Sequence, residues 1–147
     1  MARSFFISVF VVVLFASNAF AGLGSFYNNP QSSGSIVAPI QIKDKGIYNL
    51  VVSIHFLKEP YNNKIYKSDA YEKLINRLTV EWSGVALQQI LEAKEQNIND
   101  LTVLKSNIEK AIVSLADKLK NSYSLEKNTE VVFSLSNFFL LTPKDND

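Results

Sequence analysis

The sequence predicts a single α+β domain, in which a small antiparallel-type sheet of about three strands is covered by two or three amphipathic helices. Two observations lead to this class. Segments with alternating apolar residues lie towards both ends of the chain, and two long segments with helical apolar spacing lie between them. The predicted order is β-β-α-(α)-α-β. This order lacks the βαβ rhythm of a parallel sheet and is typical of an α+β domain.

Two strands are expected before the helices. Residues 36–42 alternate, and Pro39, which cannot donate a backbone hydrogen bond, indicates an edge strand. A turn over residues 43–46 leads to a second strand over residues 47–57. The apolar faces of the two strands are formed by Ile36, Ala38, Ile40 and Ile42, and by Tyr48, Leu50, Val52, Ile54 and Phe56.

Asp69 is expected to cap the first helix, with Glu72 three residues later to complete the capping box. Beyond Gly84 the apolar residues fall on a different face of the helix, so a bend or break is expected near this glycine. One apolar stripe indicates the buried side before that point: Tyr71, Leu74, Ile75, Leu78, Trp82 and Val85.

A second helix, capped by Asn99 or Asp100, and a closing strand over residues 129–141 complete the predicted domain. The apolar seam of the helix comprises Leu101, Leu104, Ile108, Ile112, Leu115 and Leu119. The alternation in the strand places these residues on the core side: Val131, Phe133, Leu135, Phe139 and Leu141.

The N-terminus has the features of a secretory signal peptide over residues 1–21. The apolar run Phe5–Ala16 has 12 residues and follows Arg3, whereas a transmembrane helix needs about 20. Small residues at Ala19 and Ala21 fit a signal peptidase, so cleavage after Ala21 and export of the remaining chain are expected. The alternative is an uncleaved N-terminal anchor.

The remaining chain divides into a flexible leader (22–35), the single domain (36–141) and a polar tail (142–147). The whole chain has 15 basic and 14 acidic residues, and loss of Arg3 leaves 14 of each. This neutral balance argues against a nucleic-acid partner and against strong membrane-surface binding after cleavage. The chain has no cysteine, which excludes disulfides and thiol chemistry.

Few residues in the chain carry catalytic chemistry. His55 is the only histidine, and a zinc site needs three or four ligands, so no metal or other cofactor is expected. Two pairs of carboxylates could in principle perform acid–base catalysis: Glu92 with Glu95, and Asp44 with Glu59. Lysines lie nearby in both cases, which favours surface ion pairs over a catalytic role. The sequence therefore predicts a protein that is not an enzyme.

Trp82 and Phe138 are the candidate interface residues. Trp82 is in register with the helix stripe, which favours a core position, but large rigid side chains also anchor protein interfaces. In the alternation of the closing strand, Phe138 faces away from the core beside Ser134 and Ser136. An outward aromatic side chain is the better candidate for a contact surface.

The segment from Tyr48 to Leu141 resembles the periplasmic domain of the FliL family of flagellar basal-body-associated proteins. The resemblance is carried, in order, by YNLVVSIHFL, SDAYEKLINRLTVEWSGVALQQI, LTVLKSNIEKAIVSLADKL and EVVFSLSNFFL. It implies a non-enzymatic domain similar to those of stomatin-type proteins, assembling as rings around the flagellar stator. Family members usually keep a transmembrane anchor in the inner membrane, whereas this chain has a short segment that ends in a cleavage site. The resemblance therefore implies a periplasmic location, with an inner-membrane anchor that faces the periplasm as the alternative.

Three hypotheses about the function follow. The first is a periplasmic structural or accessory protein of an envelope machine, flagellar by resemblance, with envelope proteins as partners and a possible homo-oligomer through the helix surface. The second is a soluble periplasmic module that binds a small ligand or a protein, through the face with Asn49, Ser53 and His55 or a cleft under the helices. The third is an enzyme with a serine and His55 as its only plausible pair.

Overall fold

The computed structural model of the chain describes residues 31–61 and 63–142 and has the predicted α+β fold. The expected signal peptide with Ala19 and Ala21, most of the leader and the last five residues of the tail lie outside the described residues. The elements in chain order are β1 (Gln31–Ile42), β2 (Gly46–Leu57), the short 3-10 helix η1 (Lys64–Lys67), α1 (Asp69–Glu92), α2 (Thr102–Ser122) and β3 (Phe133–Leu141).

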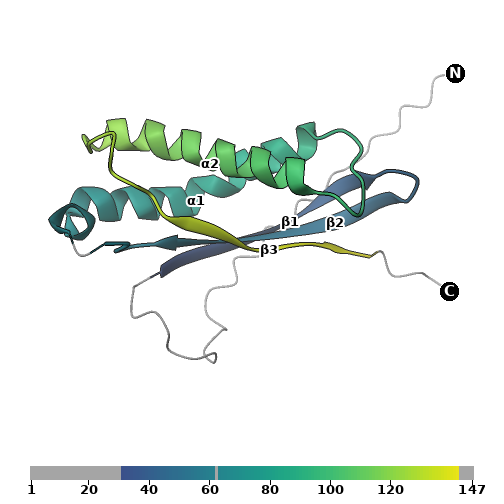
Figure 1. Cartoon of the computed structure of the whole chain (residues 1–147), viewed down its shortest axis with the longest axis horizontal. Coiled ribbons are helices and arrows are strands. Elements are labelled where there is room, and N and C mark those ends of the chain that lie inside the picture. Colours follow the sequence, from purple (N-terminus) through teal and green to yellow (C-terminus); the bar gives the residue numbers. More distant parts are fainter. Residues whose placement is uncertain (1–30, 62, 143–147) are drawn as a thin grey trace, which may run out of the picture.

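The three strands form one antiparallel sheet in the order β1-β2-β3. The edge position of β1, predicted from Pro39, is confirmed, and β2 is the central strand. Both helices lie on the same side of the sheet (Figure 1). The sheet therefore has a helix-covered face and a second face, called here the open face, on which no described helix or strand packs.

The core lies between the helices and the covered face of the sheet. The predicted apolar positions of β1 and β2 are buried, except that Tyr48 is half-buried at the margin. Trp82 is only 2% exposed and belongs to this core. The helices contribute these other buried residues: Tyr71, Leu74, Ile75, Leu78, Ala86 and Ile90 from α1, and Leu104, Ile108, Ile112 and Ala116 from α2.

The strand β1 begins earlier than the predicted boundary at residue 36. Residues 31–35 pair with β2, from Gln31 opposite Leu57 to Ser35 opposite Ser53. These residues lack the apolar alternation that marks a strand, so the sequence pattern missed them. Tertiary contacts hold them instead: the Thr79 hydroxyl of α1 donates a hydrogen bond to Ser32 Oγ at 2.9 Å.

The helix α1 runs unbroken through Gly84, so the break expected near this glycine is absent. The buried stripe continues through Ala86 and Ile90, and this packing outweighs the cost of about 1 kcal/mol for an exposed helical glycine. The cap is also one residue earlier than predicted. Ser68 is the N-cap and its Oγ accepts a hydrogen bond from the Tyr71 N–H at 3.3 Å.

The helix α2 begins at Thr102, close to the predicted cap. Asp100 Oδ1 accepts a hydrogen bond from the Thr102 N–H at 3.0 Å, although Leu101 occupies the N-cap position itself. This hydrogen bond to the first turn lowers the pKa of the Asp100 carboxyl. The polar side chain expected at this end of the helix therefore does contact the first turn.

A β-bulge interrupts the pairing of β3 with β2. Asn137 lies opposite Ser53 and Leu135 lies opposite Ile54, which leaves Ser136 without a partner. One extra residue in a strand moves every later side chain to the other face of the sheet. The bulge therefore reverses the alternation in the second half of β3.

This reversal corrects the prediction for Phe138. Phe138 lies opposite the buried Val52 and packs against the core with Leu140. Phe139 and Leu141, predicted to face the core, are each 45% exposed on the open face. Simple alternation placed both aromatic residues on the wrong sides, because it allowed for no bulge.

Candidate functional site

An apolar row crosses the open face of the sheet. Val37 of β1 pairs with Val51 of β2, and Val51 pairs with Phe139 of β3. Directly paired residues in a sheet share a face. This apolar row (Val37, Val51 and Phe139) therefore ends at β3 with a 45% exposed phenyl ring, next to Leu141.

A polar row lies next to the apolar row on the same face. Ser35 and Ser53 oxygens lie 2.8 Å apart in a hydrogen bond, and Asn137 Nδ2 donates to Ser53 Oγ at 3.0 Å. Ser53 is buried and its hydroxyl is occupied by these two neighbours. The sequence predicted a binding face of Asn49, Ser53 and His55. Its middle residue, Ser53, is not free to bind a ligand, because its hydroxyl links the three strands.

His55 lies in the next row, between Ser33 of β1 and Ser134 of β3. It is half-buried. Within the described residues its ring makes no hydrogen bond to either serine or to a carboxylate. A nucleophile and its base are recognised by a hydrogen bond between them, with a third group that orients the base. The serine–histidine pair considered for an enzyme thus lacks the geometry that would favour it.

The two carboxylate pairs considered for acid–base work are placed differently. Asp44 lies in the turn before β2 and Glu59 lies beyond its far end, so the whole strand separates them. Glu92 is at the end of α1, where it accepts a hydrogen bond from Gln88 Nε2 at 2.9 Å, and Glu95 is exposed in the segment that follows. Asp44 and Glu59 therefore do not form a pair, and of the other two carboxylates only Glu92 lines the hollow described next.

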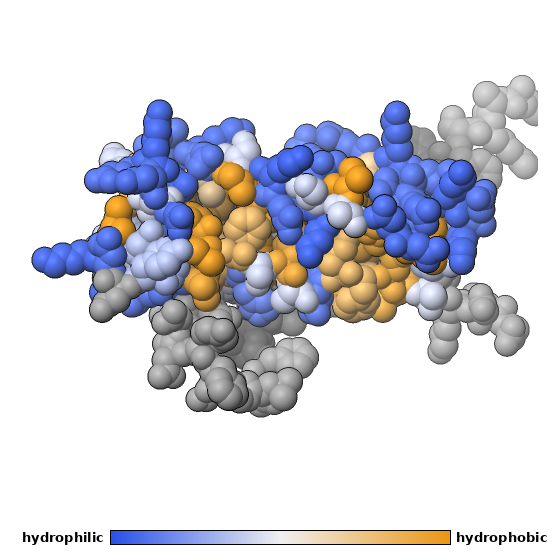
Figure 2. All heavy atoms as spheres, viewed as in Figure 1, coloured by the Kyte–Doolittle hydropathy of each residue, from blue (hydrophilic) through white to orange (hydrophobic). Residues whose placement is uncertain are grey.

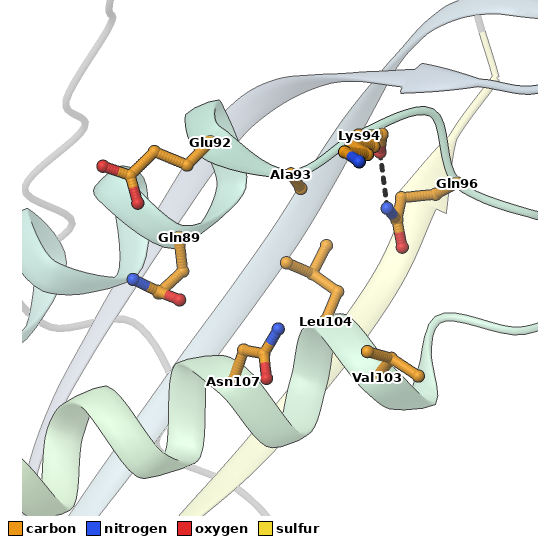
Figure 3. Close-up of a pocket in the computed structure, with 8 residues that line it drawn as sticks. All are labelled: Gln89, Glu92, Ala93, Lys94, Gln96, Val103, Leu104 and Asn107. Carbon is orange, nitrogen blue, oxygen red and sulfur yellow. Dashed lines mark hydrogen bonds between the residues drawn. The ribbon is translucent and has the colours of Figure 1, made fainter.

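A hollow of about 380 Å³ lies between the end of α1 and the start of α2 (Figure 3). Gln96 anchors its rim: its N–H donates to the Gln41 carbonyl of β1 at 2.9 Å, and its side chain donates to the Lys94 carbonyl. Amides dominate the polar wall, with the aliphatic Leu104 beside them. The residues that line it are Gln89, Glu92, Ala93, Lys94, Gln96, Val103, Leu104 and Asn107.

A cluster of three tyrosines, not recognised from the sequence, joins the end of β2 to the approach to β3. Tyr66 packs edge-on against Tyr71 with ring centroids 4.9 Å apart, and Tyr61 packs on Tyr66 at 5.5 Å. The Tyr61 hydroxyl donates to Glu130 Oε2 at 2.7 Å. The hydroxyl of the buried Tyr71 lies 3.3 Å from the Glu130 carbonyl oxygen and 3.4 Å from that of Leu57. The only sign of this cluster in the sequence is the spacing of five residues between successive tyrosines.

This tyrosine cluster makes the stability of the domain sensitive to alkaline pH. Burial raises the pKa of Tyr71, and the hydrogen bond to Glu130 raises the pKa of Tyr61. Because both pKa values are higher in the folded state, their contribution is complete below about pH 10, the unfolded value, and is lost as the pH rises further. Urea unfolding should show the free energy of unfolding falling above about pH 10, with the buried Tyr71 contributing at most about 1.4 kcal/mol per pH unit.

The variant Tyr71→Phe tests this assignment. It should flatten the alkaline fall, and it should cost about 1 kcal/mol at neutral pH because a hydroxyl hydrogen bond is lost. An alkaline slope unchanged by Tyr71→Phe would contradict the role of the buried hydroxyl. Between pH 7 and 9 these tyrosines should contribute no change in the free energy of unfolding. The values measured in that range therefore serve as the baseline for the alkaline fall.

The outer side of β3, called here the β3 edge, is the third feature of the surface. Within the described residues no strand pairs with this side. The nine residues of β3 include no charged residue and no proline. The covered-face side chains of β3, among them Phe138 and Leu140, remain half-buried, and Figure 2 shows apolar atoms at the surface along β3 and below α2.

The structure assigns different positions to the two sequence-predicted interface residues. Trp82 is enclosed in the core, which confirms the core position favoured by its place in the helix stripe. Its indole is therefore not available to a partner. Phe138 packs on the covered face of the sheet, and its neighbour Phe139 is the residue on the open face. The exposed aromatic expected on this strand exists, one residue further along.

This correction predicts effects of different size for two serine substitutions. Phe138→Ser should lower the free energy of unfolding by about 1–3 kcal/mol, because a half-buried ring in the core is lost. Phe139→Ser should change it by less than about 1 kcal/mol. Urea unfolding of both variants at low protein concentration measures the difference, and a larger loss for Phe139→Ser would contradict the bulge.

Among the described residues, neither helix has the length and apolar character needed to cross a membrane. In the same part of the chain, no group of three or more acidic or histidine side chains is placed to hold a metal ion. No protein-family model matches the chain, and no curated protein or solved structure matches it.

Proposed function

We propose that this chain is a non-enzymatic accessory protein of the cell envelope that works by assembling with other proteins. One observation carries the proposal: the β3 edge is uncharged, apolar on both faces over residues 138–141 and unpaired within the described residues. Soluble proteins usually protect such edges with charges, prolines, bulges or a covering segment. The bulge at Ser136 interrupts β3 near its middle, and the regular stretch 137–141 beyond it has neither a charge nor a proline, which suits it to pairing with another chain.

The opposite edge of the sheet provides an internal comparison. In β1, Pro39 removes a backbone donor, and a proline on an edge strand opposes the addition of a further strand. Exposed apolar side chains lie on the open face at both edges, with Phe139 and Leu141 of β3 each 45% exposed and Val37 of β1 38% exposed, so the edges differ chiefly in Pro39. The contrast between the two edges supports assembly through β3.

The location and the machine are part of the same proposal. The signal peptide read from residues 1–21 directs the chain to the periplasm, with an inner-membrane anchor as the alternative. The resemblance to the FliL family makes the flagellar basal body or stator the first machine in which to search for partners. The proposed partners are envelope proteins, including a second copy of the chain.

A binding module is the second candidate, and the hollow between α1 and α2 is the observation that favours it. Its wall combines Gln89, Gln96 and Asn107 with a carboxylate and an ammonium group, which suits a small polar ligand. Such a ligand would raise the melting temperature of the purified chain. The variant Asn107→Leu should then abolish the rise, with the exposed Val80→Leu as the control.

In-cell crosslinking of a C-terminally tagged full chain, with mass spectrometry of the adducts, tests the proposal. Envelope proteins attached to a chain that begins at Gly22 would support an exported assembly partner, and stator or basal-body proteins would support the flagellar machine. Adducts without any motor protein would contradict the flagellar part alone. An absence of protein adducts, together with thermal stabilisation by a small ligand, would favour the binding module.

A further inference from the structure

We infer that the partner of the β3 edge is a second copy of this chain, with β3 paired antiparallel to β3 about a two-fold axis at Phe139. This pairing joins two three-stranded sheets into one sheet of six strands. The inference rests on the proposed function and identifies the partner. Isologous contact of one surface with itself is the commonest way in which soluble proteins form dimers.

The β-bulge limits the register of this pairing. In an antiparallel pair, residues directly opposite each other must lie on the same face of the sheet. The extra residue Ser136 shifts the faces, so the side chains before and after it alternate out of phase. Regular self-pairing is therefore confined to residues 137–141, whose midpoint is Phe139.

The register centred on Phe139 brings apolar side chains together on both faces. Phe138 of each copy lies opposite Leu140 of the other, on the face that the helices cover. Phe139 lies opposite its own equivalent on the open face, which extends the apolar row of one copy into that of the other. A register centred on Asn137 would instead place Phe139 opposite Leu135, and these two residues lie on different faces.

The net charge of the chain and the composition of its last residues favour a second copy over other occupants. The formal net charge is +1, so two copies do not repel one another strongly. The last five residues, 143–147, begin with a proline and carry three charges, which makes them a poor strand for an apolar edge.

Cysteine crosslinking tests the register directly, because the natural chain has no cysteine. Phe139→Cys in the full chain should give a disulfide-linked dimer as the main product of mild oxidation. Leu141→Cys alone should crosslink poorly, whereas a mixture of Asn137→Cys and Leu141→Cys chains should crosslink with each other. Val80→Cys, on an exposed position of α1, reports random collisions.

Sedimentation of the purified full chain tests the dimer itself. The expected mass is about twice 16.5 kDa. Phe139→Lys should weaken dimerisation by at least about tenfold, because it places two like charges opposite each other. Its circular dichroism should stay unchanged because Phe139 is outside the core. Val80→Lys, which adds the same charge on α1, should leave the dimer intact.

Three results would overturn the inference: a monomer at the highest soluble concentration, a dimer insensitive to Phe139→Lys, or crosslinking at Val80→Cys as efficient as at Phe139→Cys. The proposed function is judged separately. A monomer that nevertheless forms adducts with other envelope proteins in cells overturns only the second copy as partner. A monomer without protein adducts in cells overturns the proposed function as well.

Discussion

Replacing Leu50 by aspartate is expected to leave the chain unable to fold. Leu50 is 0% exposed in the central strand, between Ala38 of β1 and Leu140 of β3. An unpaired buried charge costs about 3–5 kcal/mol, and the lost apolar packing adds about 2–5 kcal/mol. The sum is comparable with the whole free energy of unfolding of a typical domain, about 5–15 kcal/mol. Circular dichroism and urea unfolding should show no cooperative transition.

The matched control is Asn49→Asp, in the same strand. Asn49 is exposed on the open face, so the same new charge should change the unfolding free energy by no more than about 0.5 kcal/mol. Ile112→Asp, at a fully buried position of α2, should behave like Leu50→Asp. A Leu50→Asp variant that unfolds cooperatively near the wild-type midpoint would contradict the assignment of the covered face.

Gly34→Ala has the second large expected effect. A Cβ atom at Gly34 would lie 2.8 Å from Trp82 Nε1 and 3.3 Å from Cε2. The indole is 2% exposed and has little room to move, so the added methyl group forces a shift in the core. Overpacking of this kind typically costs about 1–3 kcal/mol, which urea unfolding can measure.

A double-mutant cycle identifies the cause of that loss. Trp82→Phe removes the indole nitrogen and the atoms next to it, so Gly34→Ala should cost at least about 1 kcal/mol less in the Trp82→Phe background. Additive losses within about 0.5 kcal/mol would contradict the contact. Gly84→Ala is the matched control, because a Cβ atom there meets nothing within 4 Å, and it should stabilise α1 slightly.

The fold class and most of the core could be predicted from the sequence because the apolar periods are regular. Alternation in residues 36–42 and 47–57 correctly gave the buried faces of β1 and β2. The stripe of α1 gave the core position of Trp82. In each case the residues that the local spacing places on one face are also the residues that pack in the core.

The features that were missed depend on contacts between distant segments. The bulge in β3 reverses Phe138 and Phe139 through pairing with β2, which no local pattern reports. Residues 31–35 are strand because β2 and α1 hold them, although their own composition is that of a loop. Gly84 is tolerated because the helix is packed on both sides of it.

The candidate site was hidden for the same reason. The sequence of β3 gave an uncharged, apolar strand, but only the strand order shows that it lies at an edge of the sheet. The sequence also indicated an exposed aromatic residue near the end of the chain. The identity of that residue, Phe139, follows from the bulge.

Site-specific photocrosslinking in living cells tests the central claim most directly, namely that this domain works by assembling with other proteins through β3. A photoreactive phenylalanine analogue replaces Phe139 in the full chain, and a second chain carries it at Val80 on α1. The account predicts light-dependent protein adducts from position 139 and few from position 80. Adducts that are absent from position 139, or equally abundant from both positions, would contradict it.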